Sequence, residues 1–306
     1  MQLKTKVMAF ATATALLFSS VNILAKTYKH ELGEITIDTV PQRVVVLGYA
    51  SLDVLDALDI EPLAIPKKLL PSYLSQYKAD KYTNTGSLQE VNYETLFKLK
   101  PDLIIAEARM ARIYKDLSEV APTYMFKMDN SNYWNTTKKN WATLGEIFNK
   151  QDKATQLINE VQTKISTLNK TVSEKNSKTL TVMSNGNNVS MFGPLSRFSF
   201  IYNEAGFEPS TSEKVKSTSR IHGDLISFEY IADAKPDTLL ILDREQAIGK
   251  SNGKAKSLFD NELVNSTPAA KNNHIIYLDP VPWYLVSGGY QSILTMIDDL
   301  NNAVSE

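Results

Sequence analysis

The sequence predicts an α/β protein built as two lobes joined by one long helix, and three patterns support this. Short apolar runs of strand length alternate with segments of helical periodicity, which is typical of parallel sheets covered by helices. No proline occurs between Pro122 and Pro194, and part of that stretch has continuous helical spacing. A helix–turn–strand unit also occurs twice, once in each half of the chain.

The N-terminus has the pattern of a secretory signal. Lys4 and Lys6 precede an apolar run from Val7 to about Phe18, and small residues lead on to Ala25. The alternative is a membrane anchor, but this run is too short to cross a hydrocarbon layer of about 30 Å. We therefore expect residues 1–25 to be a signal peptide that is cleaved after Ala25.

The apolar residues between Ala154 and Val172 recur at steps of three and four, which predicts one amphipathic helix. From about Asp152 to Glu174 this helix would be roughly 35 Å long, a suitable length for a strut between two lobes. We expect the domains to be an N-terminal lobe, a connecting helix and a C-terminal lobe, at residues 26–150, 151–175 and 176–306.

Separate apolar runs on both sides of this connecting helix predict further strands and helices. A helix is expected around Leu52–Leu58, and the C-terminus should form an amphipathic helix through Ile293 and Val304. The predicted strands are Val44–Leu47, Leu103–Ala106, Leu180–Met183, Leu239–Leu242 and Ile275–Leu278. Strands separated by helices imply a parallel sheet in each lobe.

Composition excludes several function classes. The 33 Lys and Arg are balanced by 34 Asp and Glu, so there is no basic surplus for nucleic acid. The absence of cysteine excludes disulfides, thiolate metal sites and cysteine nucleophiles. Three histidines, His30, His222 and His274, are too few for a multi-histidine zinc site. Dinucleotide-binding, phosphate-loop, serine-hydrolase and zinc-protease motifs are missing from the sequence, so we do not expect an enzyme.

The repeated unit predicts a cleft. Glu94 begins a short helix that ends at Lys-Pro-Asp, a strand follows, and Arg109 comes just after it; Glu229 and Arg244 occupy the same places 135 residues later. A helix antiparallel to its strand would place both Glu and both Arg on the same rim of their lobes. Ligands of open α/β sheets bind outside the carboxyl ends of strands, so we expect a cleft with an Arg on each wall.

Three further residues are candidates for binding. Arg197 lies in a Gly-Pro turn, His222 in a polar loop before the second unit, and Tyr284 after the last predicted strand. The planar guanidinium fork suits an anion and stacks on aromatic rings. Imidazole and phenolate are acceptable ligands for ferric iron. The alternatives are surface salt bridges for the arginines, a capping role for His222 and a core position for Tyr284; His30 and His274 are expected at the surface.

These motifs resemble a known family. The two lobes, the single connecting helix and the paired Glu-x6-Pro-Asp units resemble the class III, helical-backbone substrate-binding proteins of ABC importers for iron chelates and vitamin B12. The segments Gly-Pro-x-Ser-Arg197-Phe, Thr-Ser-Arg-Ile-His222-Gly, Leu-Asp-Arg244 and Trp-Tyr284-Leu resemble its catecholate-siderophore branch in particular. The resemblance implies two Rossmann-like lobes and a ferric enterobactin-type siderophore as transported ligand, with no permanent cofactor.

The resemblance also implies roles for single residues. Arg109, Arg197 and Arg244 match the family's anion-binding triad, and His222 and Tyr284 match its pair of iron ligands. The acidic residues that dock on permease arginines match Glu94 and Glu229. Many relatives carry an acylated cysteine that this sequence lacks, which implies a free periplasmic protein of a double-membrane bacterium. We also expect the protein to be a monomer.

The charges of such a ligand agree with these residues. Three catecholate dianions and one ferric ion leave a net charge of three minus, which three arginines would offset. A bis-catecholate leaves two of the six iron sites open, the number that His222 and Tyr284 could fill. The rival ligands are haem or another iron chelate, and the rival from another class is a periplasmic siderophore esterase.

Overall fold

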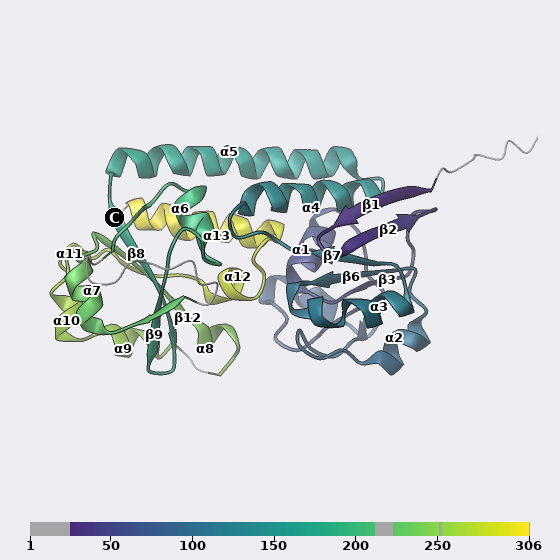
Figure 1. Cartoon of the computed structure of the whole chain (residues 1–306), viewed down its shortest axis with the longest axis horizontal. Coiled ribbons are helices and arrows are strands. Elements are labelled where there is room, and N and C mark those ends of the chain that lie inside the picture. The colour runs from purple at the N-terminus through teal and green to yellow at the C-terminus, as the bar shows by residue number, and fades with distance from the viewer. Residues whose placement is uncertain (1–24, 212–222, 251–252, 306) are drawn as a thin grey trace, which may run out of the picture.

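The computed structural model describes residues 25–211, 223–250 and 253–305 (Figure 1). Two halves, each with its own sheet, lie under the long helix α5 (Gln151–Lys175), which runs along both of them in Figure 1. This is the helix that the sequence predicts over Asp152–Glu174. Its apolar stripe is buried, and an αL Asn176 ends it.

The N-terminal half contains a parallel sheet of the order β5-β4-β3-β6-β7, preceded by a hairpin of β1 and β2. Helices and 3-10 turns connect the strands. The elements are β1 (Lys26–His30), β2 (Gly33–Ile37), β3 (Val44–Val46), α1 (Tyr49–Ala57), β4 (Ala64–Ile65), η1 (Ser72–Lys78), β5 (Thr83–Asn84), α2 (Tyr93–Leu99), β6 (Leu103–Glu107), η2 (Ala108–Ile113), α3 (Tyr114–Val120), β7 (Thr123–Phe126) and α4 (Tyr133–Ile147).

The C-terminal half contains a mixed sheet of the order β11-β9-β8-β12-β13, with β10 paired to β8. Its elements are β8 (Lys178–Asn185), β9 (Asn188–Phe192), α6 (Ser199–Asn203), β10 (Glu208–Pro209), β11 (Asp224–Ile226), α7 (Phe228–Ala234), β12 (Thr238–Asp243), α8 (Arg244–Ala247), α9 (Ala255–Phe259), α10 (Glu262–Asn265), α11 (Pro268–Lys271), β13 (Ile275–Tyr277), α12 (Pro280–Tyr284) and α13 (Tyr290–Ser305).

The expectation of a parallel sheet is confirmed in the N-terminal half and only partly in the other. Strands β8, β12 and β13 are parallel, but β9 is antiparallel to β8 and β11 is antiparallel to β9. The reason is a tight hairpin whose two-residue loop is Gly186-Asn187, with Gly186 at φ +60 and Asn185 paired with Asn188. A Gly-Asn pair between two strand runs is a hairpin signal, and it turns the chain back before any helix can form.

The repeated unit is confirmed in three dimensions. Helices α2 and α7 both end at a lysine in the left-handed region, Lys100 with φ 45 and Lys235 with φ 46. Asp102 then accepts a hydrogen bond from the backbone N–H of Arg43, and Asp237 accepts one from Lys178. Each Pro-Asp pair therefore fastens the start of the neighbouring strand, a role beyond the turn that the sequence predicts.

The closing helix α13 packs against both halves, although we expected residues 176–306 to form the C-terminal lobe. It lies beneath α5 and also contacts α1 (Figure 1). Asp53 of α1 accepts hydrogen bonds from the backbone N–H groups of Gln291 and Ser292, at 3.1 and 3.0 Å. The start of α13 is therefore fastened to the N-terminal half.

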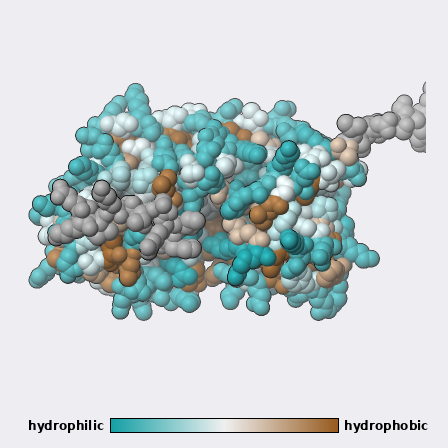
Figure 2. All heavy atoms as spheres, in the orientation of Figure 1, coloured by the Kyte–Doolittle hydropathy of each residue, from teal (hydrophilic) through white to brown (hydrophobic). Residues whose placement is uncertain are grey.

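The surface of the molecule is ordinary for a globular protein. In Figure 2 hydrophilic residues cover most of the visible face, with scattered apolar residues among them. No helix within the described ranges combines the length and the apolar character that a membrane crossing needs.

Candidate functional site

Two adjoining cavities lie where the halves face each other, and Arg197 and Tyr284 line both of them. The cavity on the side of the N-terminal half, here called the inner cavity, measures about 410 Å³ and includes Glu107, Arg109 and Lys127. The cavity on the other side measures about 500 Å³ and is lined by Met183, Asn185, Asn188, Ser190, Phe192, Arg197, Leu225, Arg244 and Tyr284. Together they have the size of a small-molecule site.

Tyr284 is the centre of this region, and all three candidate arginines contact it. Arg109 and Arg197 each donate from Nη2 to the Tyr284 carbonyl oxygen, both at 3.1 Å. Arg244 donates from Nε to the Tyr284 hydroxyl at 2.7 Å. Residues far apart in the sequence thus meet at one residue, Tyr284.

The arginines also surround the Tyr284 ring. Their guanidinium carbons lie 5.9, 4.4 and 5.5 Å from the ring centroid for Arg109, Arg197 and Arg244, within the range of cation–π contacts. Burial, reinforced by the neighbouring cation Arg109, lowers the pKa of Arg197 to about 10, so it remains charged at neutral pH.

An acid near these arginines is the buried Glu107, which interacts with Arg109 at longer range than an ion pair. Within the part of the chain that the structure describes, none of the three guanidinium groups forms an ion pair with a carboxylate. Their hydrogen-bond partners are neutral oxygens, those of Tyr284 and the Asn185 side chain. The alternative of surface salt bridging is therefore wrong for the described residues.

The fold explains this convergence. Arg109 follows β6 within η2, and Arg244 follows β12 as the first residue of α8, so both lie at the carboxyl ends of parallel strands. Tyr284 is the last residue of α12. Asp279 caps the start of this helix, because its side chain accepts a hydrogen bond from the Val281 N–H. The neighbouring Trp283 is the core residue of this pair, since it is 1% exposed and donates to Asp299.

Sequence reasoning missed several residues at these cavities, among them Asn185 and Glu107. Asn185, at the end of β8, accepts from Arg244 Nη1 at 2.9 Å, and the Gly-Asn loop that follows it is a hairpin signal in the sequence. Glu107, the last residue of β6, accepts from the Ser51 N–H and hydroxyl at 2.8 Å. Burial raises the pKa of Glu107, and the nearby Arg109 opposes that rise. The strand-end rule that predicts Arg109 would also have found Glu107.

The predicted iron-ligand pair is described only at Tyr284, because His222 lies outside the described residues. The following residue, Gly223, packs beside Phe192 of the cavity wall, since a Cβ there would lie 2.8 Å from that ring. Among the described residues, no cluster of three or more His, Asp or Glu side chains could hold a metal ion. An iron site on Tyr284 would therefore need donors from beyond the described side chains.

The predicted docking residues are both exposed. Glu94, in the first turn of α2, has a side chain 77% exposed and forms an ion pair with Lys98. Glu229 holds the equivalent place in α7, where a hydrogen bond with Ser227 lowers its pKa. Such side chains are free to meet a partner, and their docking role stays a prediction.

The other two histidines, His30 and His274, differ in their surroundings. We expected His30 at the surface, but it is half-buried between Tyr114 and Tyr124, with ring centroids 5.3 and 5.7 Å away. This burial lowers the pKa of His30. His274 is partly exposed just before β13. Neither residue lines the two cavities around Tyr284.

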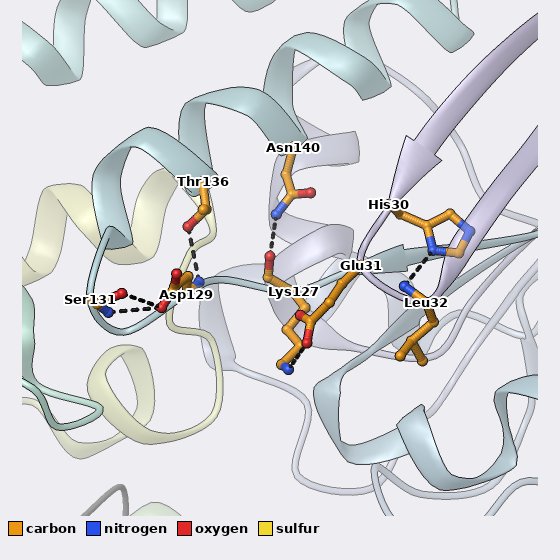
Figure 3. Close-up of polar contacts among 8 residues, drawn as sticks. All are labelled: His30, Glu31, Leu32, Lys127, Asp129, Ser131, Thr136 and Asn140. Atoms are coloured by element: carbon orange, nitrogen blue, oxygen red, sulfur yellow. Dashed lines mark hydrogen bonds and ion pairs between the residues drawn. The ribbon is translucent and has the colours of Figure 1, made fainter. Parts of the chain in front are cut away.

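A third cavity, here called the outer cavity, lies beside them and measures about 580 Å³. It includes His30, Glu31 and Asn140 of the N-terminal half and Leu195 of the other half. The segment Lys127–Asn130 separates it from the inner cavity and contributes residues to both. Figure 3 shows the polar contacts along this segment.

Comparisons with known proteins place this arrangement in a family. A family model described as periplasmic binding protein matches residues 44–282. The petrobactin-binding protein YclQ of Bacillus subtilis is 36% identical over 92% of this chain and 88% of its own. The ferric-anguibactin-binding protein FatB of Vibrio anguillarum is 34% identical over 89% and 85%.

A solved structure supports the same family assignment. The periplasmic catecholate-siderophore binding protein VctP from Vibrio cholerae is 38% identical, with a TM-score of 0.85, over 91% of this chain and 100% of that chain. The predicted helical-backbone fold is thereby confirmed. From the model match, the relatives and the shared fold, this chain belongs to the periplasmic binding protein family.

Proposed function

We propose that this protein captures a ferric catecholate siderophore between its two halves and delivers it to an ABC permease for iron uptake. It would act in the periplasm as a monomer. The observation that carries the proposal is the group of three guanidinium cations around Tyr284 without a carboxylate partner in the described chain. Like charges at such distances repel, so this arrangement favours a polyanionic ligand.

The chemistry of the site supports a catecholate in particular. A guanidinium group donates parallel hydrogen bonds to a planar oxyanion and also stacks on an aromatic face, and a catecholate offers both. Haem has two propionate carboxylates, which would pair with two of the three cations and leave the third without an anion. The names of FatB, YclQ and VctP support the siderophore class.

We further propose that His222 and Tyr284 complete the coordination of an iron that a chelator leaves partly open. Tyr284 supports this, because its side chain lines the cavity wall and its hydroxyl accepts a hydrogen bond from Arg244. Gly223, the residue that follows His222 in the sequence, packs beside the wall residue Phe192. Glu94 and Glu229 would dock the loaded protein on the permease.

A titration tests the proposal. The purified protein is titrated with ferric enterobactin, a ferric bis-catecholate, a ferric hydroxamate and haem, while tryptophan fluorescence and visible absorbance are recorded. Trp283 adjoins Tyr284, so we expect quenching by both catecholates. Binding of haem alone, or hydrolysis of the ferric catecholate, would overturn the proposal in favour of a haem carrier or an esterase.

A further inference from the structure

Lys127 lies at the same edge of the sheet as Arg109, just after the neighbouring strand. It follows β7, whose last residue Phe126 pairs with Glu107 at the end of β6. The Asn140 side chain donates to the Lys127 carbonyl oxygen at 2.9 Å and so fastens this strand end to α4 (Figure 3). Lys127 and Arg109 thus leave the same edge of one parallel sheet, where ligands of such sheets bind.

The Lys127 side chain lies between two cavities. It lines the inner cavity together with Arg109 and Arg197, and it lines the outer cavity together with Glu31. Its ammonium group is ion-paired with Glu31 in the turn between β1 and β2 (Figure 3). The side chains of Lys127 and Glu31 are 34% and 51% exposed, so water screens this pair.

The charges on the two walls are unequal without Lys127. The C-terminal half contributes Arg197 and Arg244, whereas the N-terminal half contributes Arg109 next to the buried Glu107. A trianionic chelate held between the walls would meet most of the protein's positive charge on one side. A second cation on the N-terminal wall would balance this, and Lys127 is at the right strand end to supply it.

We propose that Lys127 is a fourth cation of the ligand site, held by Glu31 in the empty protein and transferred to the anionic chelate on binding. The exchange is favourable because an exposed ion pair contributes little, whereas a polyanion in a partly enclosed cavity attracts an ammonium group more strongly. The inference rests on the proposed function, since it needs an anionic ligand.

The experiment compares ferric enterobactin affinities of four proteins at fixed ionic strength: the wild type, Lys127→Gln, Glu31→Gln and the double variant. Loss of Lys127 should weaken binding about three- to tenfold. Loss of Glu31 removes the competitor for Lys127 and should strengthen binding about two- to fivefold. In the Lys127→Gln background, Glu31→Gln should have almost no effect, because the two residues act through one contact.

Lys139→Gln is the matched control. It removes the same charge from an exposed residue that lines the outer cavity but not the inner one, so affinity should stay within about twofold. Equal effects of Lys127→Gln and Lys139→Gln would overturn the inference, and so would a Glu31→Gln effect that persists without Lys127. If the wild type fails to bind ferric enterobactin, the proposed function itself is wrong, which distinguishes the two failures.

Discussion

The two repeat units, α2–β6 and α7–β12, share a frame but differ in what surrounds it. Both helices end at a left-handed lysine, and both strands lead to an arginine at Tyr284. Arg109 then lies in a 3-10 helix beside Glu107, whereas Arg244 starts α8 and contacts Asn185. The repeat therefore supplies the walls of the cleft with one cation each, and segments outside it supply the remaining contacts.

The largest expected effect concerns the exposed acids that the repeat places on both halves. The double variant Glu94→Ala, Glu229→Ala should bind ferric siderophore with nearly wild-type affinity, because neither residue lines the cavities. Transport should be abolished, since both contacts with the permease would be lost. Uptake of radioactive iron by cells that depend on this protein measures the loss.

The matched control removes two exposed glutamates outside the repeat, Glu34 and Glu119, and should transport normally. The single variants sharpen the comparison, since equal partial losses would mean that both halves dock alike. Normal uptake by the Glu94, Glu229 double variant would show that the repeated acids have no docking role.

The next effect compares the arginines of the two halves. Hydrogen bonds to charged groups contribute about 1.5–3 kcal/mol, so Arg109→Ala, Arg197→Ala and Arg244→Ala should each weaken ferric catecholate binding at least about tenfold. Fluorescence titration gives the affinities. Arg112→Ala is the control, because Arg112 is exposed and does not line the cavities. An equal loss at Arg112, with none at Arg109, would refute the geometry.

The iron-ligand pair should distinguish chelates by the number of iron sites they leave open. His222→Ala with Tyr284→Phe should weaken a ferric bis-catecholate about tenfold and shift its visible band, yet change a hexadentate tris-catecholate by less than about twofold. The Tyr284 carbonyl, which accepts from Arg109 and Arg197, survives the substitution. Equal losses for both chelates would mean that the residues only line the pocket.

The same pair predicts a pH dependence of binding. Coordination by Tyr284 releases its phenol proton, so the bis-catecholate should bind more tightly as pH rises. The hexadentate complex needs no such release and should show a flatter profile. Titrations at several pH values on both complexes measure the difference, and parallel profiles would contradict coordination by Tyr284.

The smallest effect on ligand binding is expected at Asp53, where the start of α13 is fastened to the N-terminal half. Burial raises the pKa of Asp53 to about 7, above the value of about 3.9 in an unfolded chain. Between these values the folded protein holds a proton that the unfolded chain has released, so the free energy of unfolding should fall as pH rises from about 4 to about 7. Urea denaturation at several pH values measures this slope.

Asp53→Asn cannot ionise and should flatten that slope while leaving siderophore affinity within about twofold. Asp80→Asn, at an exposed position outside that helix, is the control and should keep the wild-type slope. An unchanged slope in Asp53→Asn would mean that other buried groups, such as Asp299, dominate the pH dependence.

Periodicity and repetition explain why much of this fold is predictable from sequence. The stripe from Ala154 to Val172 gives α5 to within one residue, because a long amphipathic helix has many positions in register. The offset of the repeat brings Arg109 and Arg244 to equivalent strand ends. The strand-end rule then places them at a cleft before any contact is known.

The residues that were missed depend on pairing and short elements. Strand β7 has four residues, too few to show a period, so Lys127 at its end went unnoticed. The antiparallel β9 follows from a two-residue hairpin rather than from strand spacing. The burial of His30 depends on Tyr114 and Tyr124, which lie far away in the sequence. Such features arise from tertiary contacts that local pattern does not encode.

The central claim is that the cations around Tyr284 select a polyanionic iron chelate. The most direct measurement compares the Kd of the wild type for a ferric tris-catecholate with its Kd for a neutral ferric tris-hydroxamate of similar size. Three charged contacts, each worth at least about tenfold, predict that the catecholate binds roughly a thousandfold more tightly. Equal affinity for the two chelates would contradict the account.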